Sequence, residues 1–269
     1  MKLLNVAVVT LALLGATAGA RADDDLSKRS PDALVENLAE IDQPSPGLAG
    51  TALYAAFIAE EADPVFQGGV LGSPPPVVPP SMRELVRRGI AALPSLIRHL
   101  ADKRPTKLVI DDRLLMWRVF DEEYDPRTRP PREACDSACI EKQFKRGRAF
   151  RGAYSVKIGD LCFVLIGQIV NRDLTAVRYQ PTGGLVVNSP IETPSLAERI
   201  KTDWGNIDAT NHEASLRADL QEPDAAWRYG SALVRLRFYY PNAYAALDGE
   251  DAKKRAAFEA DEQKRHAGK

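Results

Sequence analysis

The chain has 269 residues with 36 basic and 37 acidic side chains, so its formal net charge at pH 7 is −1. Dedicated nucleic-acid-binding domains are usually distinctly basic, so this near-neutral balance argues against a nucleic-acid partner. Hydrophobic residues make up 45% of the chain, which is enough for a folded core and argues against a wholly disordered protein.

Residues 1–22 have the pattern of a secretory signal peptide. Lys2 gives a positive start, residues 3–14 are almost wholly apolar, and Ala20-Arg21-Ala22 forms a small-x-small cleavage motif. This apolar run is shorter than the roughly 20 residues that cross a bilayer. We therefore expect an exported protein, periplasmic or extracellular after cleavage, with no stable membrane anchor.

The first helix is predicted to start at Pro31. Ser30 can cap the free N–H groups of a first turn, and proline is well tolerated at the first helical position. The proline-containing segment 42–47 ends this helix, and a second helix is predicted from about residue 48 to residue 62. Residues 68–80, GGVLGSPPPVVPP, cannot be helical because proline lacks the N–H donor, so we expect a stiff connector.

Residues 81–104 predict two short helices joined by a tight turn. Ser81 is the expected N-cap of the first helix, and Gly89 is its expected C-terminal stop. Pro94 lies in the first turn of the second helix. The apolar residues of the second helix form one stripe at helical spacing: Leu93, Leu96, Ile97 and Leu100.

The order of residues in segment 81–104 is a leucine pair, a glycine, two alanines, Leu-Pro, and Leu-Ile-x-x-Leu-x-Asp. This order resembles one helical repeat of the HEAT or armadillo type, and the resemblance covers this segment alone. It implies helix pairs that stack on their neighbours and leave a concave surface for partners. No second copy follows at a period of about 40 residues.

Downstream, most segments also have helical patterns. Residues 107–120 could be a third helix or a strand, whereas residues 177–190 lack a helical period and predict a loop that could include a short extended piece. The run 158–171 is apolar on all sides and too long for a usual strand, which favours a central buried helix. Further helices are predicted from residue 194, over 211–220 and over 224–240, followed by a charged, frayed helical tail over 251–269.

These elements predict a mainly α fold over residues 23–250. We expect a single domain of irregular HEAT-like helical pairs, either an α-solenoid-like array or a compact helical domain, with long Pro-rich loops. Stability has to come from apolar burial, because three cysteines are too few for a disulfide-built scaffold.

Two of the cysteines, Cys135 and Cys139, form a candidate local disulfide if they lie in a loop or at a helix entry. Covalent haem attachment would need a histidine at position 140, where Ile140 stands. Zinc would need two further ligands. We therefore expect no metal and no cofactor.

An enzymatic role is the weaker alternative. Cys162 precedes His212 in the order seen in papain-like hydrolases, but its apolar surroundings indicate a buried structural cysteine. The acidic run 121–125 lacks the spaced ligands of a calcium loop and is expected to be a solvated loop. A hydrolase-like enzyme using Cys162 or this acidic run therefore stays the second choice, and a non-enzyme is favoured.

Two segments are candidate binding surfaces. The basic stretch 142–151 could bind an anionic glycan or a lipid headgroup, although a solvated helix face is the commoner outcome. Its candidate residues are Lys142, Lys145, Arg146 and Arg148. The polar loop predicted between two apolar elements adds Arg178, Tyr179, Gln180 and Asn188. The sequence thus predicts an exported helical scaffold or binding protein with an unknown protein or glycan partner.

Overall fold

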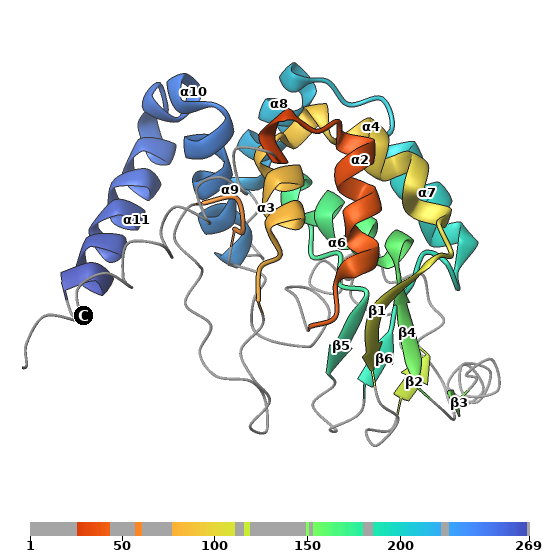
Figure 1. The fold of residues 1–269 in the computed structure, drawn as a ribbon. Coiled ribbons are helices and arrows are strands. Elements are labelled where there is room, and N and C mark those ends of the chain that lie inside the picture. The colour runs from red at the N-terminus through yellow and green to blue at the C-terminus, as the bar shows by residue number, and fades with distance from the viewer. Residues whose placement is uncertain are drawn as a thin grey trace, which may run out of the picture.

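The computed structural model describes residues 26–43, 57–60, 77–110, 116–118, 149–150, 153–179, 185–221 and 226–267. Within these residues the fold is mainly helical, as predicted. The helices form the larger part of the molecule, and the strands lie together at one end of it (Figure 1).

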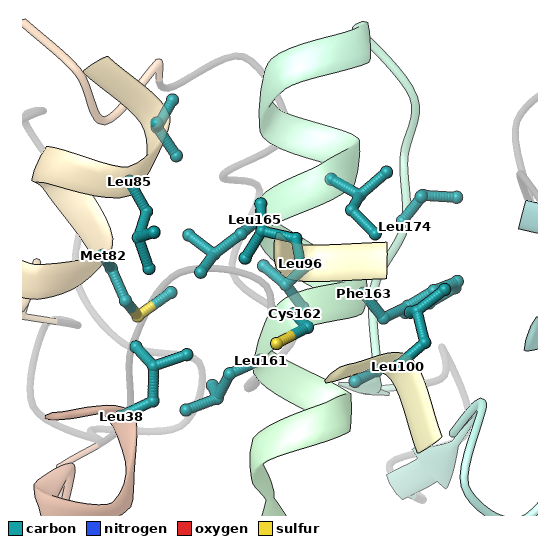
Figure 2. Packing of buried hydrophobic residues seen from close by; sticks show 14 of the residues in the cluster. Leu38, Met82, Leu85, Leu96, Leu100, Leu161, Cys162, Phe163, Leu165 and Leu174 are labelled. Atoms are coloured by element: carbon teal, nitrogen blue, oxygen red, sulfur yellow. The ribbon is translucent and has the colours of Figure 1, made fainter. Parts of the chain in front are cut away.

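The centre of the molecule is helix α6 (Ile158–Val170), in which every residue except Gln168 is buried. This confirms the helix predicted over 158–171. Helices α3 (Pro80–Arg87), α4 (Leu93–Arg98) and α8 (Ala209–Asp219) contact α6 directly. Figure 2 shows apolar side chains from several elements packing around α6, and burial of these side chains is the main favourable contribution to folding.

Helix α2 (Pro31–Glu36) packs on α3 and α4 and continues into the 3-10 helix η1 (Asn37–Glu40). The Ser30 cap is confirmed, because its hydroxyl oxygen accepts from the amide of Ala33 at 3.2 Å. The helix predicted over 48–62 is wrong where it can be tested, since residues 57–60 form a turn. Residues 48–56 and 61–62 lie outside the described residues.

The predicted helix pair at 81–104 is present, with one correction at its start. Helix α3 begins at Pro80, and Pro79 occupies the N-cap position, so Ser81 lies inside the first turn and does not cap the helix. Gly89 has a φ of +54°, in the left-handed region that favours glycine, and it ends α3 as predicted.

The second helix of this pair is flanked by tighter helical turns. The 3-10 helix η4 (Gly89–Ala91) precedes α4, and the 3-10 helix η5 (His99–Ala101) follows it. The predicted stripe forms part of the core: Leu93, Leu96 and Leu100 are buried, and Ile97 packs against them.

The structure contains two small sheets that the sequence pattern did not specify. Strand β1 (Pro105–Ile110) pairs antiparallel with β4 (Tyr154–Lys157). The second sheet has the order β3-β2-β6-β5. Its strands are β3 (Ala149–Phe150), β2 (Met116–Arg118), β6 (Leu185–Val187) and β5 (Val177–Tyr179). Segment 107–120 therefore contains strands and no described helix, and the loop predicted over 177–190 is corrected to a β5–β6 hairpin.

The C-terminal part is helical, as predicted. It consists of α7 (Pro194–Trp204), which packs on α4, then α8, α9 (Ala226–Tyr239), α10 (Pro241–Ala245) and α11 (Gly249–Ala267). A second apolar cluster lies among these elements and includes Leu216, Leu233 and Tyr244. The charged tail forms α11, and ion pairs and hydrogen bonds such as Arg237–Glu262 at 2.6 Å connect it to α9 and α10.

Candidate functional site

A buried polar cluster lies at the N-terminal end of α6 and centres on the carboxylate of Asp160. The hydroxyl of Tyr154 donates to Asp160 Oδ2 at 2.8 Å, and the amide of Lys157 donates to the same oxygen at 2.9 Å. The hydroxyl of Ser189 donates to the other oxygen, Oδ1. The carboxylate thus joins β4, the first turn of α6 and the segment after β6.

These contacts give the cluster a structural role, because they hold the start of α6 against β4 and the segment after β6. Asp160 and Ser189 have 0% exposed surface, and burial raises the pKa of the Asp160 carboxyl. Burial also raises the pKa of the Tyr154 phenol far above its ordinary value. The Ser189 oxygen accepts from the amide of Ile191 at 3.1 Å while its proton is held by Asp160. A serine enclosed in this way cannot meet a substrate without opening of the fold.

A second buried polar cluster lies at the C-terminal end of α6, where Asn171 ends the helix with a φ of +58°. Asparagine tolerates this left-handed conformation better than most residues. Its side-chain amide donates to Asp219 Oδ2 at 2.8 Å, and its carbonyl oxygen accepts from the Ser231 hydroxyl at 2.6 Å. Arg172 Nη1 also donates to Asp219 Oδ2, at 2.7 Å. These bonds connect α6, α8 and α9.

Arg235 of α9 is a buried cation beside this second cluster, with 2% of its surface exposed. Its Nε donates to the carbonyl oxygen of Gln168 at 2.6 Å, and its Nη1 donates to that of Ser231 at 3.0 Å. The guanidinium also lies 4.9 Å from the ring centre of Phe57. Burial lowers the pKa of Arg235 to about 10. The arginine therefore fastens α9 to α6 and to residues 57–60.

Cys162 and His212 do not form a catalytic pair. Cys162 is fully buried among leucines (Figure 2), and burial raises the pKa of its thiol well above the ordinary value. His212 instead bonds to the carbonyl oxygen of Ile169 at 3.0 Å. Cys162 and Ile169 are seven residues apart along α6, which corresponds to about 10 Å along the helix axis. Neither side chain is placed to activate the other.

The second predicted binding segment is a strand hairpin and not a long loop. Arg178 and Tyr179 lie in β5, where they pair with Val186 and Leu185 of β6. Asn188 follows β6 and is buried, so it belongs to the base of the hairpin and not to an exposed loop. Gln180 lies outside the described residues.

The base of this hairpin is anchored in the core. Val177 has 0% and Val187 has 1% of its surface exposed, and the two residues are opposite each other in the sheet. The amide of Asn188 donates to the carbonyl oxygen of Ala176 at 2.7 Å. The backbone of Arg178 and Tyr179 therefore continues from a buried, hydrogen-bonded base.

Several predicted site residues lie outside the described residues. These are the basic residues Lys142, Lys145, Arg146 and Arg148, the cysteines Cys135 and Cys139, and the acidic run 121–125. The glycan-binding surface and the local disulfide therefore stay predictions. In the part of the chain that is described, no three histidine, cysteine, aspartate or glutamate side chains are grouped to hold a metal ion.

An exposed row of ion pairs connects α2 and η1 to the segment from α4 to β1. The pairs are Asp32–Arg98, Glu36–Arg104 and Glu40–Lys107. Their side chains are about half exposed or more, so solvent screening leaves each pair with only a small contribution to stability. The row orients α2 on the helical layer. Each acidic side chain in it is paired with a basic one, so the row does not form a surface of a single charge.

Sequence reasoning missed the residues that hold α6 in place: Asp160, Ser189, Asn171 and Arg235. A signal was present for two of them, because Asp160 interrupts an apolar run and Arg235 interrupts the apolar stripes of α9. A charged residue inside such a pattern indicates a buried partner, since burial of an unpaired charge is very costly. The identity of the partner was not visible in the sequence.

Comparisons of the chain with protein-family models, with curated proteins and with solved structures gave no match. Among the helices of the described residues, none combines the length and the apolarity that a membrane span requires.

Proposed function

We propose that this chain is an exported, mainly helical binding or scaffold protein whose protein or glycan partner contacts the β5–β6 hairpin. The observation that carries the proposal is the anchored base of the hairpin at Val177, Val187 and Asn188. A backbone segment that is held at its base by a packed core keeps its place in the fold, and binding segments are commonly held in this way. Arg178 and Tyr179 are the residues that we assign to the partner contact.

The enclosure of the chemically reactive groups supports a binding role over an enzymatic one. Cys162, Ser189 and His212 each have 0% of their surface exposed. Ser189 and His212 are fully engaged in hydrogen bonds that hold α6 to its neighbours. A nucleophile or base needs access to the group that it attacks, and these three have none in the closed fold.

HEAT-like stacking of helix pairs is part of the proposal. Its support is the helix pair at 81–104 and the side-by-side packing of α8 and α9. The pairs do not follow one repeat length along the chain, so the stacking we propose is irregular.

Export is tested by producing the full chain with a C-terminal tag in a bacterial host and fractionating the cells. We expect the tagged protein in the exported fraction with an N-terminus at Asp23, because cleavage follows Ala22. Leu11→Arg places a charge in the apolar core of the signal and should leave the uncleaved chain in the cytosol. Retention of the uncleaved wild-type chain in the cytosol would contradict the proposal.

Partner binding is tested with a photo-crosslinking amino acid at position 179. We expect discrete adducts in the exported fraction, and we expect Arg178→Ala to reduce their yield severalfold. The matched control carries the same amino acid at Glu250, an exposed position at the start of α11 far along the chain from the hairpin. Equal adduct patterns at both positions, or no adduct at position 179, would refute binding through the hairpin.

A further inference from the structure

His212 connects α8 to α6 and to the end of α9 through both of its ring nitrogens. Nε2 lies 3.0 Å from the carbonyl oxygen of Ile169, and Nδ1 lies 2.9 Å from the hydroxyl oxygen of Tyr240. A carbonyl oxygen can only accept, so Nε2 carries the ring proton and Nδ1 accepts from the Tyr240 hydroxyl. The ring is fully buried, and a neutral imidazole can make both bonds.

The surroundings of His212 disfavour a positive charge on the ring. The charged and titratable groups near the ring or its partner come from three elements. Arg235 and Tyr239 lie in α9 and Tyr240 follows it, Arg172 follows α6, Asp208 is the N-cap of α8, and Glu213 lies in α8. Arg235 and Arg172 both repel an imidazolium. The carboxylate of Asp219 lies 2.7 Å from Arg172 and is engaged by that cation.

We propose that His212 is a pH-sensitive latch, which holds α8 on α6 while its ring is neutral and releases α8 when its ring is protonated. The Tyr240 hydroxyl can rotate to accept from a protonated Nδ1, so the hydrogen bond itself does not oppose protonation. The opposition comes from burial and from the two arginines. Separation of α8 from α6 exposes the ring to water and relieves both.

The direction of the pH effect follows from proton binding. Burial is the main cause that lowers the pKa of His212 from 6.5 to about 4 in the closed fold. The open form therefore binds more protons between these two values, and acidification favours opening. The stabilising contribution of the closed latch is complete above pH 6.5. It decreases as the pH falls from 6.5 to 4, and below pH 4 it decreases no further. By pH 4 the opening equilibrium of α8 increases about 100-fold.

Hydrogen exchange measured by mass spectrometry on the full chain tests this proposal. Exchange times are scaled to the intrinsic rate between pH 7.5 and pH 4, and peptides from α8 are compared with peptides from α6. We expect amide protection in α8 to fall about 100-fold across this range, while protection in α6 stays nearly constant. Constant protection in α8, or equal losses in α8 and α6, would overturn the proposal.

The matched variants are His212→Gln and His99→Gln, which each remove one imidazole ring, the first inside the latch and the second outside it. We expect His212→Gln to abolish the pH dependence in α8 and His99→Gln to retain it. A pH dependence that persists in His212→Gln would contradict the latch. If that variant does not fold, nitrogen NMR of His212 in the wild-type chain decides the question. A ring that is neutral at pH 5.5 with its proton on Nε2 supports the latch, and a ring that is charged at that pH refutes it.

Discussion

The hydroxyl of Tyr154 donates to the carboxylate of Asp160 at 2.8 Å, and this bond joins strand β4 to the first turn of α6. The same carboxylate accepts from Ser189, which follows β6. Asp160 therefore fixes the position of the central helix relative to both sheets. Its removal would leave two buried hydroxyl groups without their acceptor.

We expect Asp160→Ala to lower the free energy of unfolding by about 3 kcal/mol, since unsatisfied buried polar groups cost about 1–3 kcal/mol each. Urea denaturation at pH 7 measures this loss. Asp160→Asn is the control, because its amide keeps one oxygen for Tyr154 and Lys157. A loss with Asp160→Ala no larger than that with Asp160→Asn would argue against the fastening role.

The start of α6 approaches its neighbours so closely that only glycine fits at position 159. A Cβ atom there would lie 2.5 Å from the carbonyl oxygen of Leu100 and 2.6 Å from Cδ1 of Ile191. We expect Gly159→Ala to destabilise the protein by about 1–3 kcal/mol, because a packed backbone has to move. Thermal or urea unfolding provides the measurement.

The same substitution at Gly230 in α9 is expected to change the stability in the opposite direction. A Cβ atom at that position would meet nothing within 4 Å. Gly230→Ala should stabilise the protein by about 0.5–1 kcal/mol, because alanine has the higher helix propensity. If both substitutions destabilise the protein equally, the close approach at Gly159 is not the cause.

Cys162 should be inert to alkylation in the folded protein. The thiol is fully buried and its pKa is raised, so little thiolate forms and iodoacetamide has no access. In a Cys135→Ser, Cys139→Ser background, intact-mass measurement should detect no adduct at pH 8 and one adduct after unfolding in urea. Rapid labelling of the folded protein would instead favour the hydrolase-like alternative.

The central helix could be predicted from the sequence because twelve of its residues are buried, which produces an apolar run longer than a strand. The short strands could not be predicted from the sequence in this way. β5 and β6 have three residues each, too few to display an alternating pattern. β5 pairs with β6, and β6 also pairs with β2, which is more than 65 residues earlier in the chain. Tertiary pairing therefore decided the structure of this segment, and local propensity did not.

The hydrogen bonds that hold α6 to its neighbours join residues that are far apart in the sequence. Gln168 is the single polar side chain of residues 161–170, and its side-chain oxygen accepts from the amide of Ile58 at 3.4 Å, 110 residues away. Its carbonyl oxygen accepts from Arg235, 67 residues away. No spacing rule connects such positions, so a single sequence indicates that a partner is needed without naming it.

The Asp102 carboxylate should contribute stability that acid removes. Its side chain is 12% exposed, and Arg104 Nε donates to it at 3.0 Å, a bond that is the main cause lowering the pKa of Asp102 from 3.8 to about 2. A carboxyl with a lowered folded-state pKa stabilises the protein above pH 3.8, and this contribution is lost as the pH falls toward 2. We expect Asp102→Asn to lower the free energy of unfolding by about 2 kcal/mol at pH 7 and by little near pH 2.

Asp32→Asn is the control for burial. The Asp32 side chain is 52% exposed, so this substitution should lower the free energy of unfolding by about 1 kcal/mol or less. Urea denaturation at several pH values measures both, and equal losses would show that burial does not strengthen the Asp102 contacts.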